Sequence, residues 1–413
     1  MAALSNNEKA RQDTEELNRT VDSLDQENLP PANIMVAGIT GTGKSTLVNA
    51  VFRNDFAETG KGRPVTSNLQ RYESPDIPIR IWDTVGLELD SATTERSIRD
   101  IRNVIAEMGE KNDHFDRIHA IWYCVNSGSS RYQGAELKFI KALHDIGVPF
   151  IIVLTQCIGD PEEIDAFEKE IRRINADMGM GDIDVVQVCA QDFKLRGFTI
   201  ESFGLDKLIE TTTRRLPEFI KGAFIAAQQV NKAQKRERCE EIIFSYVQKA
   251  QNGFFDKVPF INLFTTDHNV EKMFRDIGTS YYKVFGEQAS HVIRRLIKNV
   301  DAGLFDIIGK TFRKAWNKDE YSEKIQALFA KHGVDAKDYN RIPKLLACYG
   351  YIFLDAVEQV WGELTEEQLK NINAVIDKLK EVLNEKFLRF SKILAPDSDI
   401  KEYSGSDLYG PLS

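Results

Sequence analysis

Eight residues near the start of the chain, Gly38-Ile39-Thr40-Gly41-Thr42-Gly43-Lys44-Ser45, match the pattern G-x-x-x-x-G-K-[ST] at every fixed position. The apolar run 34–37 before them favours a strand, and residues 45–51 after them favour a helix. Glycines at such a junction allow positive φ, so backbone N–H groups turn inward at the positive end of the helix dipole. The stretch predicts a phosphate-binding loop made of Gly41, Thr42, Gly43, Lys44, Ser45 and Thr46.

Two further segments fit the same site. An apolar strand ends in Asp83-Thr84-Val85-Gly86, where Asp83 can hold a magnesium-bound water and the Gly86 amide can contact a γ-phosphate. The loop 60–67 carries Thr66, which suits a metal ligand that orders with nucleotide, although a plain loop is the alternative. The predicted Mg²⁺ ligands are Ser45, Thr66 and Asp83, and the predicted catalytic residues are Lys44, Thr66 and Gly86.

Short Ile/Val-rich runs alternate with amphipathic segments between residues 32 and 220. The expected strands are 33–38, 77–82, 118–125, 149–155 and 185–190, with an edge strand at 68–73. The expected helices are 44–53, 93–110, 134–146, 161–178 and 204–216. This order predicts an α/β fold with a mainly parallel six-stranded sheet covered by helices on both faces.

Beyond residue 220 the strand pattern gives way to helical periodicity. The expected helices are 218–252, 267–284, 286–301, 304–317, 320–331, 336–362 and 365–393. We therefore divide the chain into an N-terminal helical arm (1–31), a nucleotide-binding domain (32–220), an all-α helical domain (221–395) and a flexible tail (396–413).

Composition narrows the function classes. The 413 residues include 54 basic and 63 acidic ones, a net charge of −9, which argues against nucleic acid as a partner. The five cysteines are scattered with no CxxC pair, as expected for a reduced protein without a disulfide framework. No signal peptide and no apolar stretch of about 18 residues is found, so a cytoplasmic protein is expected.

With these three elements in this order, residues 32–220 resemble the translation-factor-related GTPases, especially the Era-like and septin-like branches. The resemblance implies a P-loop GTPase that binds GTP and Mg²⁺ and hydrolyses GTP to GDP and phosphate as a nucleotide switch. The switch would reposition a helical effector domain that binds an unknown effector protein.

The resemblance weakens where those families carry [NT]-K-x-D. Thr155 is in place, but Gln156 replaces the lysine, Ile158 occupies the aspartate position, and Asp160 comes two residues late. The next base-binding motif resembles Val188-Cys189-Ala190, so the predicted nucleotide-binding set also includes Thr155, Gln156, Asp160, Cys189 and Ala190. Guanine is selected if a bulge brings Asp160 to the base; otherwise ATP or mixed use remains open.

A second departure is Leu87, which follows Gly86 where Ras-like enzymes carry a water-orienting glutamine. Slow intrinsic hydrolysis is therefore expected, with faster turnover if a group is supplied in trans, for example in a homodimer formed through the GTPase domain. A scaffold with negligible turnover is the alternative.

The region 253–286 is similar to the helical part of immunity-related GTPases and of bacterial GTPases with an appended helical domain. That similarity implies architecture, and it raises the alternative of a dynamin-like or immunity-GTPase-like assembly with conditional, peripheral membrane contact. The apolar stretch 254–264 is interpreted as core packing, with shallow membrane insertion as the alternative.

Overall fold

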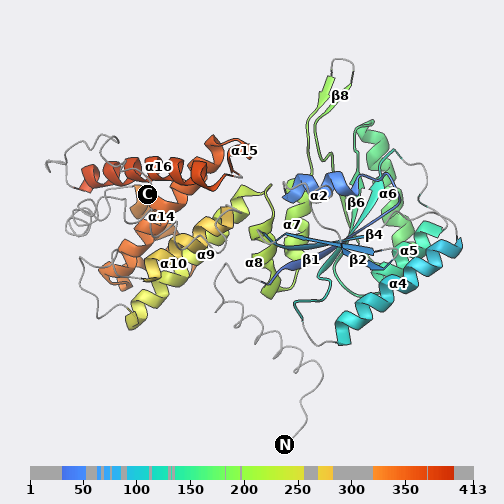
Figure 1. Ribbon diagram of the computed structural model, residues 1–413, viewed down its shortest axis with the longest axis horizontal. Helices are drawn as coiled ribbons and strands as arrows, with labels where there is room; N and C mark the ends of the chain where they lie inside the picture. The colour runs from blue at the N-terminus through green and yellow to red at the C-terminus, as the bar shows by residue number, and fades with distance from the viewer. Residues whose placement is uncertain are drawn as a thin grey trace, which may run out of the picture. The chain divides into compact units, whose positions relative to one another are not determined.

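The computed structural model describes residues 30–52, 63–66, 69–74, 77–84, 91–110, 114–128, 132, 135–181, 183–195, 198–254, 268–281, 320–369 and 371–394. These residues form two compact units (Figure 1). The described residues up to Lys232 belong to the first unit, and those from Ala233 onward belong to the second.

The first unit is built on a seven-stranded sheet with the order β2-β3-β4-β1-β5-β6-β7 (Figure 1). The strands are β1 (Ala32–Ala37), β2 (Arg63–Thr66), β3 (Leu69–Ser74), β4 (Ile77–Thr84), β5 (Ala120–Asn126), β6 (Phe150–Thr155) and β7 (Asp184–Gln187). β1 pairs in parallel with β4 and β5, and β6 pairs in parallel with β5 and β7. β2 and β3 add an antiparallel edge. The α/β class with a mainly parallel sheet is confirmed.

The strand count differs from the expected six. β2, at residues 63–66, lies in the segment that we interpreted as a loop, and it displaces β3 from the edge of the sheet. The sequence hides this strand because it is short and contains Pro64, which a sheet accepts at an edge or a bulge. Its pairing with β3 is irregular between Pro64 and Thr66, as expected for such a bulge.

Burial of β1 on both faces explains why all of its residues except Asn33 are apolar. All six of its residues are buried. Ile34 and Val36 belong to one core cluster, and Met35 and Ala37 belong to the other. Because successive side chains of a strand point to opposite faces, a strand covered on both sides has no position for an exposed polar residue.

Helices cover both faces of this sheet (Figure 1). α2 (Lys44–Phe52), α7 (Leu205–Arg215) and α8 (Glu218–Ala227) contribute to the cluster that contains Ile34 and Val36. α4 (Ser91–Glu110), α5 (Ala135–His144) and α6 (Pro161–Asp177) contribute to the cluster on the opposite face. A small separate hairpin, β8 (Phe193–Leu195) with β9 (Phe198–Ile200), lies between β7 and α7 in the chain.

The first unit extends past residue 220, where we placed the domain boundary. Phe219, Ile220 and Phe224 of α8 are buried in the core of the sheet, and the Phe224 ring lies 6.3 Å from that of Trp122. The single helix expected over 218–252 is also interrupted. Gln228 ends α8, and its side-chain oxygen accepts hydrogen bonds from the N–H groups of Val230 (2.7 Å) and Asn231 (2.8 Å).

The second unit is helical throughout the part of it that the structure describes. Its elements are α9 (Lys232–Lys249), the π-helix η2 (Ala250–Phe254), α10 (His268–Tyr281), α13 (Glu320–Lys331), the 3₁₀-helix η5 (Ala336–Asp338), α14 (Arg341–Glu363), α15 (Glu366–Leu369) and α16 (Ile372–Leu394). The expected helices at 286–301 and 304–317 and the tail 396–413 lie outside the described residues, as do residues 1–29 of the arm 1–31 and most of 254–264.

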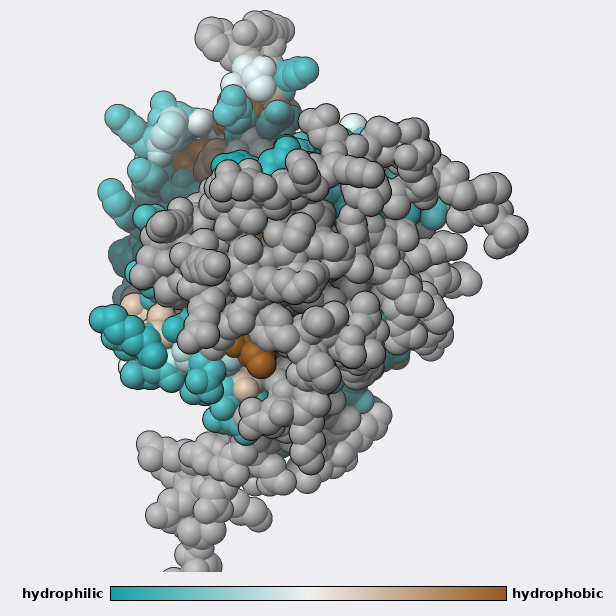
Figure 2. Space-filling model, turned by 90° about the vertical axis from the view of Figure 1, so that its left-hand side faces the viewer, coloured by the Kyte–Doolittle hydropathy of each residue, from teal (hydrophilic) through white to brown (hydrophobic). Residues whose placement is uncertain are grey.

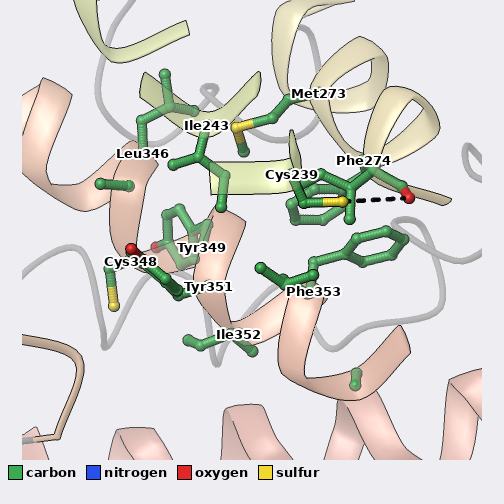
Figure 3. Close-up of a cluster of buried hydrophobic side chains, with 14 of the residues drawn as sticks. Cys239, Ile243, Met273, Phe274, Leu346, Cys348, Tyr349, Tyr351, Ile352 and Phe353 are labelled. Carbon is green, nitrogen blue, oxygen red and sulfur yellow. Dashed lines mark hydrogen bonds between the residues drawn. The ribbon is translucent and has the colours of Figure 1, made fainter. Parts of the chain in front are cut away.

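The core of the second unit is filled by aromatic and aliphatic side chains, and Figure 3 shows the part where α9, α10 and α14 meet. Phe274 of α10 stacks on Phe353 of α14 with ring centroids 4.2 Å apart. A Cβ atom on Gly350 would lie 2.7 Å from Ile243 Cγ1, so α9 and α14 approach closely at this glycine. Cys239 is fully buried beside them, and all five cysteines of the chain are buried free thiols.

The described helices include none with the length and apolarity needed to cross a membrane. The described surface that faces the viewer in Figure 2 is mainly hydrophilic.

Glu136 carries a buried carboxyl group between α5 and β5. It lies in the first turn of α5 with 3% of its surface exposed, and its Oε1 accepts a hydrogen bond from the Tyr123 hydroxyl at 3.2 Å. Burial raises its pKa from 4.5 to about 7, and the hydrogen bond from Tyr123 opposes this shift. The folded protein therefore favours the neutral form.

Replacing Glu136→Gln should stabilise the protein in a pH-dependent way. Because folding raises the Glu136 pKa, the folded state binds the proton more tightly, and wild-type stability falls as pH rises from 4.5 to about 7. Glutamine does not ionise, so the variant does not lose stability in this way. It should be more stable than wild type by roughly 3 kcal/mol at pH 8, and the difference should vanish near pH 4.5. Chemical denaturation at both pH values measures the difference.

The exposed Glu163→Gln serves as the matched control, and it should change stability by less than about 0.5 kcal/mol at either pH. A Glu136→Gln variant that is no more stable than wild type at pH 8 would show that the carboxyl group is better solvated than its burial indicates.

Candidate functional site

The loop between β1 and α2 follows a path that only glycine allows at three positions. Gly38, Gly41 and Gly43 have φ values of 144°, 83° and 79°. At Gly38 the space is also closed, because a Cβ atom there would lie 2.4 Å from the carbonyl oxygen of Cys124 on β5. The Thr42 N–H and hydroxyl both donate to the Ile39 carbonyl, at 3.3 and 2.8 Å, which closes the turn.

Lys44 is held at the centre of this loop. It is the first residue of α2 and is 9% exposed. Its ammonium donates to the carbonyl oxygens of Gly38 (3.0 Å) and Ile39 (3.2 Å). Ser45 and Thr46 follow it on the exposed side of the first turn. A lysine, a serine hydroxyl and the backbone amides of a helix N-terminus thus come from adjacent residues at the start of α2, and such helix starts are suited to bind phosphate.

Asp83 provides an unpaired buried acceptor on the strand next to this loop. β4 pairs in parallel with β1, and Asp83 is in register with Val36. Its Oδ1 atom is buried without a hydrogen-bond partner among the described residues. Burial raises the pKa of Asp83 from 3.8 to about 6, and the charge of Lys44 counteracts this. A desolvated carboxylate oxygen and a serine hydroxyl are both of the oxygen ligand types that Mg²⁺ prefers.

Thr66, the other predicted metal ligand, ends β2 and is half-buried. It is in register with Leu69 on β3, and Leu69 is in register with Thr84, the neighbour of Asp83. The backbone register therefore directs Thr66 and Asp83 toward the same end of the sheet. Gly86 and Leu87 lie outside the described residues.

The segment after β6 is tied to the phosphate loop by two side chains. The Thr155 hydroxyl is buried, and it lies 2.6 Å from the Thr42 carbonyl oxygen and 3.1 Å from that of Val125. The Gln156 amide nitrogen donates to the Gly41 carbonyl oxygen at 3.0 Å. Gln156 is the one non-glycine residue with positive φ among those described, at 54°. These predicted base-site residues therefore support the loop predicted to bind phosphate.

Two residues that the sequence analysis did not include complete this support. Asn126 Nδ2 donates to Gln156 Oε1 at 3.2 Å, and the Ser127 hydroxyl donates to the Gln156 carbonyl oxygen at 2.7 Å. Both follow directly after the apolar run of β5. The signal that could have found them is their place at the carboxyl end of a central parallel strand, where such sheets bind ligands.

The remaining base-site residues are engaged in local structure. Asp160 is the N-cap of α6, and its Oδ1 accepts a hydrogen bond from the Glu162 N–H at 2.8 Å. The Cys189 N–H donates to the Phe203 carbonyl oxygen at 3.0 Å, and the Cys189 thiol contacts the Gln191 carbonyl oxygen at 3.2 Å. Ala190 is half-buried beside the core cluster that contains Ile34. The structure thus places the predicted phosphate-binding residues in one loop and helix start, whereas Asp160 stabilises a helix end.

Residues 33–156 match a family described as the 50S ribosome-binding GTPases. This range holds the phosphate loop, Asp83 and the Thr155–Gln156 support. The first unit contains a P-loop GTPase domain. A helical C-terminal region follows this domain.

One curated relative is the interferon-gamma-inducible GTPase 10 of Mus musculus, which is 22% identical over 272 residues. The match covers 62% of this chain, and the chain spans 60% of that relative's length. Among solved structures, a bacterial selenocysteine-specific elongation factor, EF-Sec, is 19% identical with a TM-score of 0.30, covering 45% of this chain and 28% of the other. Elongation factor SelB from Methanococcus maripaludis, in complex with the GTP analogue GppNHp, is 17% identical with a TM-score of 0.29, covering 46% and 35%.

The unpaired carboxylate of Asp83 should reduce the stability of the protein when no nucleotide or metal is bound. Asp83→Asn removes the buried charge, so it should stabilise the ligand-free protein by roughly 1–3 kcal/mol at pH 7.5. Thermal unfolding in the presence of EDTA measures the effect. The control is Asp177→Asn, whose carboxylate is 66% exposed and should change stability by less than about 0.5 kcal/mol. Destabilisation by Asp83→Asn would contradict this description of the site.

Proposed function

We propose that the protein is a Mg²⁺-dependent GTP-binding protein that hydrolyses GTP to GDP and phosphate and acts as a nucleotide switch. The observation that carries the proposal is the pairing of two groups: a buried Lys44 in a loop with three positive-φ glycines, and the buried Oδ1 atom of Asp83 on the adjacent strand, which has no hydrogen-bond partner among the described residues. One group attracts phosphate, and the other attracts a divalent cation. Because the Lys44 charge acts on Asp83, the two groups are close enough to favour binding of a nucleoside triphosphate with its Mg²⁺ over binding of a simple anion.

Each residue has a defined role in this proposal. The loop amides from Gly41 to Thr46 and the Lys44 ammonium bind the phosphate oxygens, and the base lies toward the loops that follow β6 and β7. Ser45, Thr66 and Asp83 would hold Mg²⁺, which neutralises developing charge on the phosphate when bound. The support that Thr155 and Gln156 give the loop keeps the amides in place before the ligand arrives, so little reorganisation is needed.

The helical unit is the proposed effector part of the switch. The match to the interferon-inducible GTPase covers 62% of the chain, more than the first unit contains, so this likeness extends into the helices. A homodimer that activates hydrolysis is a specific alternative to an isolated switch, because Leu87 leaves the water-orienting group to be supplied in trans. Membrane contact has no supporting observation in the part of the chain that the structure describes.

Lys44→Ala is the direct test of the phosphate site. Loss of a charge-assisted contact to phosphate should weaken the binding of Mg²⁺–GDP by about 100-fold or more. Isothermal titration calorimetry on the full chain measures the affinity. Lys169→Ala removes an exposed lysine of α6 and should leave it unchanged. If Lys44→Ala bound the nucleotide as well as wild type, the site would lie elsewhere.

Turnover separates the switch from its alternatives. Since Leu87 cannot orient a water molecule, basal phosphate release should be slower than about 10⁻² per second at low protein concentration. A specific activity that rises with protein concentration supports a dimer-activated GTPase. A flat rate near zero at all concentrations supports a scaffold and contradicts the proposed hydrolysis.

A further inference from the structure

The segment from Thr155 to Asp160 decides how the nucleotide base is read. A carboxylate can select guanine because both of its oxygens accept hydrogen bonds, one from the ring N1–H and one from the 2-amino group. Adenine has neither donor. A site built around such a contact rejects the analogue that lacks the donors by a factor on the order of 10⁴. The question is therefore whether a free carboxylate is present in this segment.

Asp160 is the one acidic residue in this segment, and it is committed to α6. Its Oδ1 accepts from the Glu162 N–H at 2.8 Å, and its carbonyl oxygen accepts from the Ile164 N–H at 3.0 Å. Its backbone is extended, with φ −63° and ψ 127°, and Pro161 begins the helix directly after it. This geometry is typical of an N-cap, in which the side chain turns toward its own helix. A second, bidentate contact with a base would break the cap.

The position that would hold the guanine-reading aspartate is occupied by Ile158, which is half-buried. Its N–H donates to the Gln156 carbonyl oxygen at 2.8 Å, and the Cys157 N–H donates to the Val188 carbonyl oxygen at 3.2 Å. This places the residue at the junction of the loops after β6 and β7. An apolar side chain there can pack against either purine but offers no acceptor.

Gln156 does not replace the missing charge. Its side-chain amide is used at both ends, donating to the Gly41 carbonyl oxygen and accepting from Asn126. The segment thus strengthens the phosphate loop with neutral groups and leaves the base edge without a charged partner.

We propose that this site binds guanine and adenine nucleotides with affinities within about tenfold of one another, its affinity coming from the phosphate loop. This inference rests on the proposed function, because it takes the loop at 38–45 as the phosphate site. It concerns the base alone, so the two can fail separately.

The test compares Mg²⁺–GDP, Mg²⁺–ADP and Mg²⁺–pyrophosphate binding to the full chain by calorimetry. The expected result is that all three bind and that the two nucleotides differ by less than tenfold in Kd. A preference for either purine beyond tenfold overturns the inference while leaving the phosphate site intact. Failure of all three to bind overturns the proposed function and this inference with it.

Three variants test which position faces the base. Asp160→Asn keeps a capping side chain but removes the carboxylate, so the ratio of the GDP and ADP affinities should stay as in wild type. If instead GDP affinity falls tenfold or more while ADP affinity is unchanged, Asp160 reads guanine and the inference is wrong. Ile158→Asp places a carboxylate at the position that lacks one, and it should raise the affinity for GDP relative to ADP at least tenfold. Ile158→Asn, similar in shape but uncharged, should not; an equal rise in both variants would contradict the assignment of this position to the base.

Discussion

The positive φ of three glycines in the loop after β1 is the constraint on which the candidate site depends. Such a backbone path has no intrinsic preference to persist, because glycine loses more conformational entropy on folding than any other residue. It is held at both ends by buried structure. β1 is buried on both faces, and Leu47, Val51 and Phe52 of α2 pack into the core of the sheet. Thr155 and Gln156 hold its middle through main-chain carbonyl oxygens.

This arrangement places two opposite charges where water cannot solvate them fully. Lys44 is satisfied by carbonyl oxygens of the loop, whereas Asp83 Oδ1 has no partner among the described residues. A buried, unpaired carboxylate costs stability unless a cation neutralises it. Without a bound cation, the protein should therefore be less stable than a variant with a neutral residue in place of Asp83. Such a cost is expected where function, rather than folding, determines the residue.

The sequence predicted those features that follow from local patterns. Strict glycine spacing located the phosphate loop, continuous Ile/Val runs located strands such as β1 and β6, and five amphipathic segments located α2 and α4 to α7 within a few residues. It missed β2 because an edge strand of four residues with a proline carries no periodic signal. It ended the first domain too early because the apolar face of α8 looks the same whether it packs on a sheet or on other helices.

The roles of individual polar residues depended on contacts far apart in the sequence. The Gln156 amide contacts Gly41, 115 positions earlier, and no spacing rule anticipates such a hydrogen bond. Asp160 illustrates a competition between two roles: the pattern Asp-Pro-Glu-Glu is typical of a helix start, and that local preference places the carboxylate at the end of α6. Cys189 is similar, since its N–H is taken by a bridge to Phe203 that the sequence does not reveal.

Amide hydrogen exchange, with and without Mg²⁺–GDP, measures most directly whether the loop after β1 binds the nucleotide. We predict that bound nucleotide slows exchange in residues 39–46 and in residues 155–158, because ligand oxygens and the side chains of Thr155 and Gln156 hold the loop together. Unchanged exchange in both segments, with protection confined to the helical unit, would contradict it.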